Sequence, residues 1–237
     1  MAIMAELQEN LTNMAIFETA ASLNELNDSS IRKPYRLKRI FDAVFSLFMI
    51  ILLSPLYLLI ACVIKLTSLN EPVIFKQRRI GYKGKEFICY KFRTMVPDAE
   101  KHLEIILEKK PKLKEQFNKE FKLKKDSRII PLIGDFLRKT SLDELPQFFN
   151  VLKGDMSVVG PRPVVMKEIT KYGEHIISLI SVMPGITGLW QVSGRNNISY
   201  EQRVLLDDFY AKNNSFLMDL KIIFKTIFVM VNKSGAY

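Results

Sequence analysis

The stretch that decides the fold is AVFSLFMIILLSPLYLLIACVI, residues 43–64, which carries no charged side chain. At about 1.5 Å per residue, a helix of this length reaches across a hydrocarbon core of roughly 30 Å. Ser54 and Pro55 stand in its middle, and a proline there removes a backbone hydrogen bond and kinks the helix. The stretch therefore predicts a broken membrane helix, either a kinked span or a helix that enters one leaflet and returns.

Basic residues flank this run on both sides, so the positive charge gives no clear direction of crossing. They are Arg36, Lys38 and Arg39 before it, and Lys65, Lys76, Arg78 and Arg79 after it. A re-entrant helix over residues 37–67 keeps both of its ends on the cytosolic side, whereas a simple span separates them. Residues 1–30 have no basic region leading into an apolar core, so we expect no signal peptide, and we expect residues 1–36 to form an N-terminal tail.

Downstream of the apolar run, VIFKQRRIGYKGKEFICYKFRTM, residues 73–95, predicts two strands around a turn that uses Gly81 and Gly84. Lys91 and Arg93 alternate with Phe92, which places both charges on one face of a strand. That face is either solvated or an anion site.

Two further segments have helical patterns. Residues 98–125 are rich in lysine and interrupted by Pro111, which suits a surface for anionic lipid or a solvated helix. Near the C-terminus, FLMDLKIIFKTIFVMV, residues 216–231, is too short and too charged to span, so it either lies in the membrane interface or packs on the core. With the predicted strands, these patterns indicate a predominantly helical α+β fold.

Composition narrows the function classes. The 237 residues are 48% hydrophobic, enough for a core, and a net charge of +10 points to an anionic partner: nucleic acid, lipid headgroups or a phosphorylated substrate. The cysteines, Cys62 and Cys89, form neither a disulfide framework nor a metal-ligand spacing. His102 and His175 belong to no serine–histidine arrangement, so we do not expect imidazole-based catalysis.

The segment TSLDELPQ, from Thr140, places two carboxylates, Asp143 and Glu144, just before Pro146. Ser141 and Glu144 have the spacing of a capping box, which predicts a helix start and needs no chemistry. Pro146 instead favours a helix that starts beside it and leaves both carboxylates in an irregular turn.

Several ordered motifs, taken together, resemble the bacterial sugar transferases, the monotopic phosphoglycosyltransferases that begin glycan assembly on polyprenyl phosphate. The likeness covers roughly residues 37–225 and rests on KRIFD, the central Ser54-Pro55, KFRTM, SLDELPQ, KGDMSVVGPRP, PGITGLWQVSGRN, LDDFY and MDLK.

The resemblance implies transfer of a sugar-1-phosphate from a UDP-sugar to undecaprenyl phosphate, with release of UMP, as the first membrane step of surface glycan assembly. It implies Mg²⁺ as cofactor, membrane lipid as a partner and no nucleic acid. It also implies a re-entrant helix and a compact catalytic domain, residues 68–237, on the cytoplasmic face of the bacterial inner membrane. A monomer and a homo-oligomer are both compatible with the sequence.

The resemblance also assigns residues. Asp143 would be the nucleophile that forms a phosphosugar intermediate, with Glu144 as its catalytic partner and both carboxylates near the metal. The expected substrate-binding residues are Lys91, Arg93, Arg162, Arg195, Asp207 and Asp219. This agrees with the chemistry, because a carboxylate attacks phosphorus only if it is ionised and its anionic target is neutralised by cations. We expect helix N-terminal N–H groups to keep Asp143 ionised.

Two other functions fit parts of the pattern. A membrane-anchored basic binding protein would bind polyanions in a salt-sensitive way and would not need Asp143. A glycosyltransferase that moves the sugar without its phosphate would release UDP in place of UMP.

Overall fold

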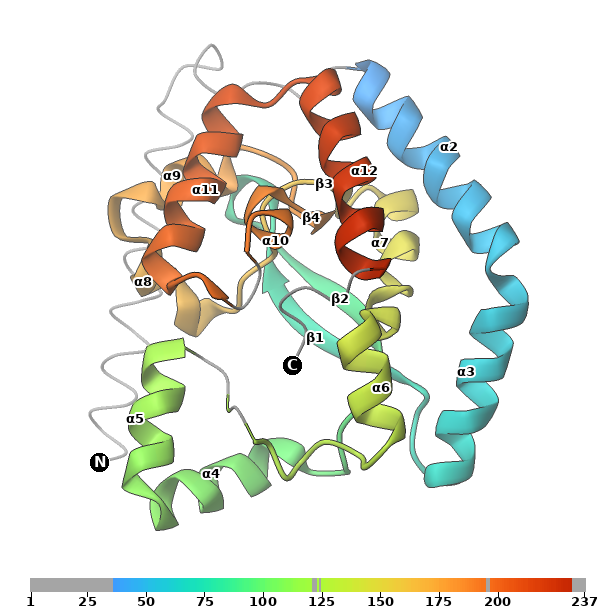
Figure 1. Ribbon diagram of the computed structural model, residues 1–237, viewed down its shortest axis with the longest axis vertical. Coiled ribbons are helices and arrows are strands. Elements are labelled where there is room, and N and C mark those ends of the chain that lie inside the picture. The colour runs from blue at the N-terminus through green and yellow to red at the C-terminus, as the bar shows by residue number, and fades with distance from the viewer. Residues whose placement is uncertain (1–35, 121–122, 124, 195–196, 232–237) are drawn as a thin grey trace.

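The protein, seen here in a computed structural model that describes residues 36–120, 123, 125–194 and 197–231, is mostly helical with two small sheets (Figure 1). The predicted α+β class is confirmed. The longer helices are α2 (Arg36–Leu52), α3 (Ser54–Thr67), α4 (Ala99–Lys109), α5 (Pro111–Glu120), α6 (Ile133–Thr140), α7 (Gln147–Lys153), α11 (Tyr200–Asn213) and α12 (Phe216–Val231). Shorter ones are α8 (Ile169–Tyr172), α9 (Ile176–Ile180) and α10 (Leu189–Val192).

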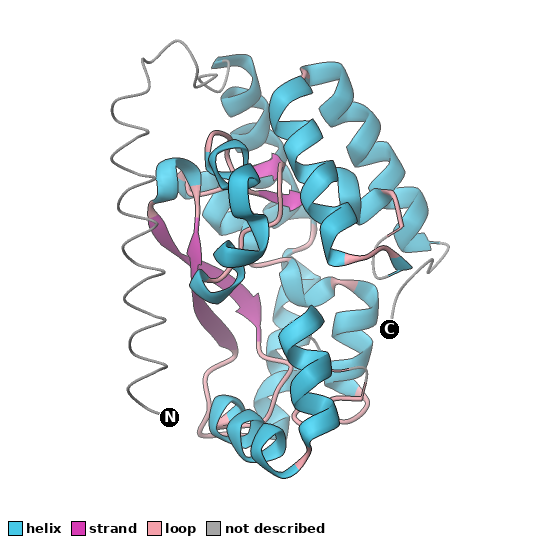
Figure 2. Ribbon diagram, turned by 90° about the vertical axis from the view of Figure 1, so that its left-hand side faces the viewer, coloured by secondary structure: helices cyan, strands magenta, loops and turns pink. Residues whose placement is uncertain are grey.

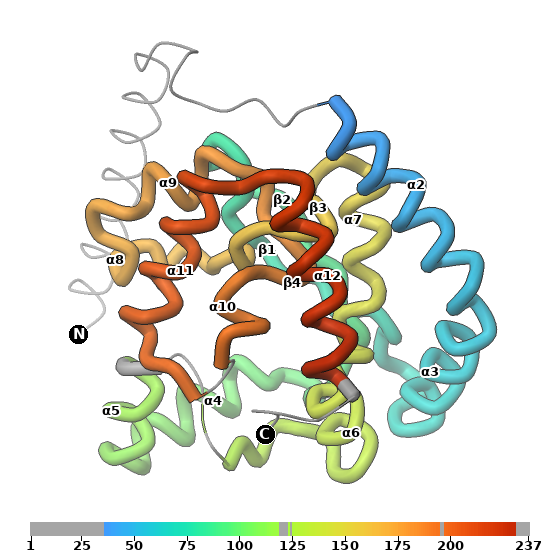
Figure 3. Tube along the Cα trace, turned by 45° about the horizontal axis from the view of Figure 1, so that its top comes forward, coloured from blue at the N-terminus to red at the C-terminus, as the bar shows by residue number. Residues whose placement is uncertain are grey.

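The predicted break at Ser54-Pro55 is present. Helices α2 and α3 meet at an angle of 62° and form an arc along one side of the molecule (Figure 3). Pro55 cannot donate to the carbonyl of Ile51 four residues earlier, and the Ser54 hydroxyl donates to that carbonyl at 2.8 Å instead. Within the described ranges no single helix is long and apolar enough to cross a membrane, and only this bent pair meets the length and composition requirement together.

The longer sheet is a hairpin in which β1 (Ile74–Ile80) pairs antiparallel with β2 (Glu86–Phe92), as predicted from the sequence (Figure 2). Lys83 and Gly84 take positive φ values of 56° and 71° in the turn between them. Such left-handed backbone suits the tight reversal, since glycine adopts it without steric cost.

The second sheet was not predicted. Strand β3 (Ser157–Val159) lies parallel to β4 (Gly185–Thr187), which is far from it in sequence. Gly160 and Gly185 allow this contact, because a Cβ on Gly160 would lie 2.2 Å from the carbonyl oxygen of Met183.

Polar side chains tie α2 to the rest of the protein. Lys38 Nζ lies 2.6 Å from Asp219 Oδ2 on α12, and Tyr210 of α11 donates to the other oxygen of Asp219 at 2.6 Å. Four residues after Lys38, Asp42 accepts from the backbone N–H of Val158 at 3.0 Å. All these partners are buried, so α2 is fixed to the domain by internal bonds.

Helix α7 is bonded both to α2 and to β2. Arg39 of α2 donates to the carbonyls of Val151 and Leu152 in its last turn. Asn150 accepts from the N–H of Tyr90 at 3.0 Å and donates to the carbonyl of Ile88 at 2.6 Å, so its amide acts as a strand partner for β2. Helix α7 is thereby held against β2.

Candidate active site

Asp143 and Glu144 lie in a single 3₁₀ turn, η2 (Leu142–Glu144), just before Pro146 and α7. The predicted capping box is wrong: Ser141 takes left-handed backbone, φ 57°, as the residue that ends α6, and its side chain caps nothing in η2. The alternative, a helix start beside Pro146 with both carboxylates in an irregular turn, is confirmed.

Glu144 is paired with two cations. Its Oε1 accepts from Lys91 Nζ at 2.6 Å and from Arg162 Nη1 at 3.0 Å. Burial raises the pKa of a carboxyl, but here Lys91 and Arg162 outweigh burial and hold the pKa of Glu144 well below its usual range. Glu144 is therefore an anion fixed in place by β2 and by the Pro161–Pro163 loop.

Asp143 has a different setting. It is 9% exposed and accepts no hydrogen bond from the described residues. Burial raises its pKa to about 6, and the charge of Glu144 adds to this while Lys91 opposes it. No backbone N–H group contributes to this pKa, so the expected helix N–H groups do not keep Asp143 ionised; Lys91, Arg138 and Arg162 are the groups that favour its charged form.

The two carboxylates open into a large cleft together with Lys91, Arg93, Arg138 and Arg162. Arg138, at the end of α6, is a residue that sequence reasoning missed, and its charge acts on Asp143. A sequence signal existed, since Arg138 lies only five residues before Asp143. That spacing alone does not show that Arg138 lies near Asp143, because the path of the chain between them depends on the left-handed backbone of Ser141.

The guanidinium group of Arg93 is buried beside the cleft. It is 6% exposed and lines the cleft on the same strand face as Lys91, and its Nε and Nη1 have no hydrogen-bond partner among the described residues. Its nearest anionic group is Glu71, 4.0 Å away. Buried guanidinium donors without partners are costly unless a ligand satisfies them.

The remaining expected site residues do not join this group. Asp219 bonds Lys38 and Tyr210, and Asp207 accepts from Tyr172 Oη at 2.9 Å; both are 1% exposed and neither lines the cleft. Burial raises the pKa of Asp207 to about 8, against the opposing effects of Tyr172 and Arg162. Arg195 lies outside the described residues.

A divalent cation would find a partial site here. No group of three or more His, Cys, Asp or Glu side chains suited to a metal occurs in the described part of the chain. Mg²⁺, however, often binds through one or two carboxylates plus water and substrate phosphates. Both cation bonds to Glu144 end on Oε1, so Oε2 and the unbonded carboxylate of Asp143 fit that pattern.

Two largely buried carboxylates beside four cationic side chains, in a domain that also carries a broken apolar helix pair, form a site suited to enzyme chemistry. The sequence model of one family, described as bacterial sugar transferase, matches residues 33–233. The chain belongs to this family, and the predictions of that family and of an enzyme are confirmed.

Relatives from several bacteria support this membership. The chain is 45% identical over 223 residues to an undecaprenyl-phosphate galactose phosphotransferase of Salmonella typhimurium, a match that covers 94% of this chain and 46% of the relative. It is 46% identical over 201 residues to a UDP-galactose-lipid carrier transferase of Erwinia amylovora, a match that covers 85% of this chain and 42% of the relative. The exopolysaccharide production protein ExoY of Rhizobium meliloti is 43% identical to it over 200 residues, a match that covers 84% of this chain and 88% of ExoY. The chain thus spans about half the length of the first two and most of the third.

Proposed function

We propose that the protein transfers a sugar-1-phosphate from a UDP-sugar to undecaprenyl phosphate and releases UMP. The observation that carries this proposal is the asymmetry of the two carboxylates: Glu144 is bonded by Lys91 and Arg162, whereas Asp143 beside it accepts no hydrogen bond from the described residues. A carboxylate left without bonds among cations is suited to attack phosphorus.

In the first step, an Asp143 oxygen attacks the β-phosphorus of the UDP-sugar. A bond from that oxygen to phosphorus forms, the bond to the oxygen that bridges the two phosphates breaks, and UMP leaves with the electron pair. In the second step, a phosphate oxygen of the polyprenyl phosphate attacks the same phosphorus. The carboxylate is released and the sugar diphosphate lipid forms.

The cations around the turn neutralise charge during both steps. Lys91 and Arg162 already contact Glu144, so a phosphate that enters beside Asp143 meets them without large movement. Arg93, with its two unpartnered donors, is the third group that we assign to substrate phosphate. We assign no substrate contact to Asp207 or Asp219.

We include Mg²⁺ in the proposal, held by Asp143 and Glu144 together with the donor's phosphates. When bound it would reduce the repulsion between the diphosphate and the carboxylates. Asp143 and Glu144 contribute only two carboxylates, so the substrate phosphates must supply further oxygen ligands.

We place α2 and α3 in one leaflet of the bacterial inner membrane as a re-entrant pair, with the catalytic domain on the cytoplasmic face. The support is the 62° bend and the apolar outer face of the pair, where Val44, Leu47, Phe48 and Leu58 are each at least half exposed. The internal ion pair of Lys38 ties that helix to the domain. Helix α12 also exposes apolar side chains, among them Leu217 and Phe228.

The test is product identity. The protein is incubated with undecaprenyl phosphate, Mg²⁺ and a panel of UDP-sugars that begins with UDP-galactose, because two relatives are named for galactose. We expect UMP and a sugar diphosphate lipid, and no product after chelation until Mg²⁺ is restored. Release of UDP would show transfer of the sugar alone, and the absence of any product with every donor would favour a binding protein.

A further inference from the structure

One face of the broken helix pair forms a continuous apolar wall of the cleft. Its members recur every three or four residues and run across the break at Ser54-Pro55: Phe41, Phe45, Met49, Leu53 and Leu56. All are partly buried, whereas Val44, Leu47, Phe48 and Ile51 on the other side of α2 are exposed and do not line the cleft. The pair therefore has one apolar face outward and a second one turned into the protein.

Helix α12 forms the opposite wall. Its cleft-lining side chains are Leu220, Ile223, Phe224, Thr226, Ile227, Val229 and Met230. Phe224 is 70% exposed and Ile227 is 57% exposed, so this wall is not filled by the protein's own core. Thr226 is its only polar member, and its hydroxyl already bonds Thr187 at 2.7 Å and the carbonyl of Ile222 at 2.8 Å.

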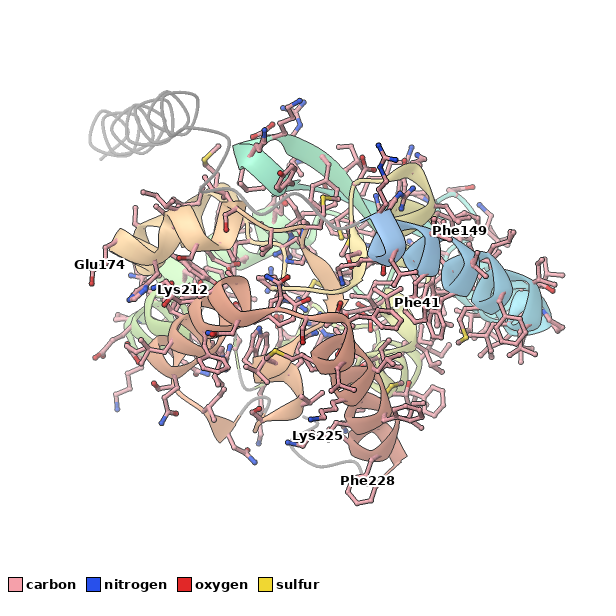
Figure 4. All side chains as sticks on the ribbon, turned by 90° about the horizontal axis from the view of Figure 1, so that it is seen from above. Phe41, Phe149, Glu174, Lys212, Lys225 and Phe228 are labelled. Carbon is pink, nitrogen blue, oxygen red and sulfur yellow. The ribbon has the colours of Figure 1, made fainter. Side chains whose placement is uncertain are left out.

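The end of this groove reaches the two carboxylates. Phe148 of α7 lines the cleft between the walls, with its ring 6.2 Å from that of Phe45. Leu145 and Leu142 continue the apolar lining to Asp143. Figure 4 shows Phe41 on the inner side of α2, while Phe228 projects from α12 away from the body of the protein. The groove is thus apolar along its length and cationic where it meets Asp143.

We propose that this groove holds the first isoprene units of the polyprenyl phosphate acceptor, an assignment that rests on the proposed function. The occupant must combine an apolar chain with an anionic end, because the walls offer no charge and the end offers Lys91, Arg138 and Arg162. A peptide fits poorly, since its backbone N–H and C=O groups need hydrogen-bond partners that these walls lack. A prenyl chain needs none and gains from losing contact with water.

The chain offers a matched pair of test positions. Phe224 and Phe228 lie one turn apart on α12 and are 70% and 67% exposed, but only Phe224 lines the cleft. Replacing either with alanine removes the same apolar surface from the same exposed helix. Loss of membrane contact would affect both variants, whereas loss of acceptor contact would affect only Phe224→Ala.

The experiment measures kcat/KM for polyprenyl phosphates of increasing chain length with one UDP-sugar in detergent. Wild type and Phe228→Ala should gain efficiency as the first isoprene units are added, and Phe224→Ala should lose that gain by about tenfold, a typical penalty for lost apolar contact in a pocket. Release of UMP in the absence of acceptor should be equal in all three. Ile227→Ala serves as a second groove variant if Phe224→Ala lowers the thermal midpoint.

Two results would overturn the assignment while leaving the proposed function intact: the same dependence on chain length in Phe224→Ala as in wild type, or an equal loss in Phe228→Ala. A change in self-association confined to Phe224→Ala would place a second copy of the chain in the groove and also contradict it. If wild type forms no polyprenyl product at all, the proposed function fails first and the assignment fails with it.

Discussion

Asp143 and Glu144 are neighbours of the same chemical type, yet the fold gives them opposite settings. Glu144 is paired with Lys91 and Arg162, which lowers its pKa, whereas burial without bonds raises that of Asp143 to about 6. Such separation of two like groups is typical of sites in which one carboxylate reacts and the other organises its surroundings.

Asp207 provides a test at the same scale. Its pKa is about 8 in the fold and 3.8 when exposed, so between these values the folded state holds one more proton than the unfolded state. The contribution of Asp207 to the free energy of unfolding therefore falls as pH rises from about 4 to 8. Asp207→Asn keeps an acceptor for Tyr172 and should raise the free energy of unfolding at pH 8 by at least about 1 kcal/mol, with little effect near pH 4.

The measurement is denaturant unfolding in detergent across that pH range. Asp208→Asn is the control, because bonds from Lys212, Ser178 and His175 overcome its burial and lower its pKa, so this variant should lose stability at pH 8. If Asp207→Asn lost sugar-phosphate transfer activity while its free energy of unfolding stayed unchanged, Asp207 would instead belong to the substrate-binding residues.

Sequence reasoning named most of the charged residues that the fold brings into the cleft, but not all of their partners. Asp143, Glu144, Lys91, Arg93 and Arg162 could be named because they stand in short motifs, and the fold brings them to one cleft. The surroundings of Asp219 depend on Lys38, 181 residues away, and no local pattern contains that pairing. Arg138 was missed because its position beside Asp143 depends on the left-handed backbone of Ser141.

At the scale of elements, the ion pair between Lys38 and Asp219 joins α2 to α12. Lys38→Met should destabilise the protein by about 3–5 kcal/mol, because it leaves a buried carboxylate without its counter-charge. The double variant Lys38→Met with Asp219→Leu should recover most of this loss, since Tyr210 can still donate to the carbonyl of Val159 at 3.1 Å.

Unfolding midpoints in detergent measure both variants, with Lys221→Met on the exposed face of α12 as the control. If the double variant were no more stable than Lys38→Met alone, the pair would not be the main link between α2 and α12.

The break between α2 and α3 allows a second test. Replacing Ser54 and Pro55 with leucine restores the missing N–H and should straighten the pair into a span, which moves the N-terminal tail across the membrane. Single cysteines are placed at Ser29 or Ser234 in a background without Cys62 and Cys89, and intact cells are labelled with an impermeant reagent.

In the otherwise unchanged protein both positions should stay protected until the membrane is permeabilised. Ser29 should become reactive only in the leucine variant. Labelling of Ser29 but not Ser234 in intact cells, without the leucine changes, would show that the segment crosses and would contradict the re-entrant placement.

The helices and strands were easier to predict from the sequence than the contacts between them. The broken apolar helix, the hairpin, the interruption at Pro111 and α12 all follow from periodicity, glycine and proline, which act locally. The β3–β4 sheet does not, because each strand has only three residues and their pairing depends on the close approach at Gly160 and Gly185.

At the scale of the whole molecule, a helix pair suited to one leaflet is bonded to a domain whose cationic cleft opens beside it. The net charge of +10 is consistent with anionic substrates and an anionic membrane surface. In the proposed function, the nucleotide sugar would reach this cleft from the aqueous side and the lipid phosphate from the membrane side.

The most direct test of the central claim is to trap the intermediate on Asp143. The protein is incubated with a UDP-sugar labelled in its β-phosphate, without acceptor, and the labelled peptide is mapped by mass spectrometry. We predict one labelled residue, Asp143, with an equal amount of UMP released, discharge of the label when polyprenyl phosphate is added, and no label or product in Asp143→Asn. Full transfer by Asp143→Asn, or product formation at the normal rate with no labelled protein at any time, would contradict the account.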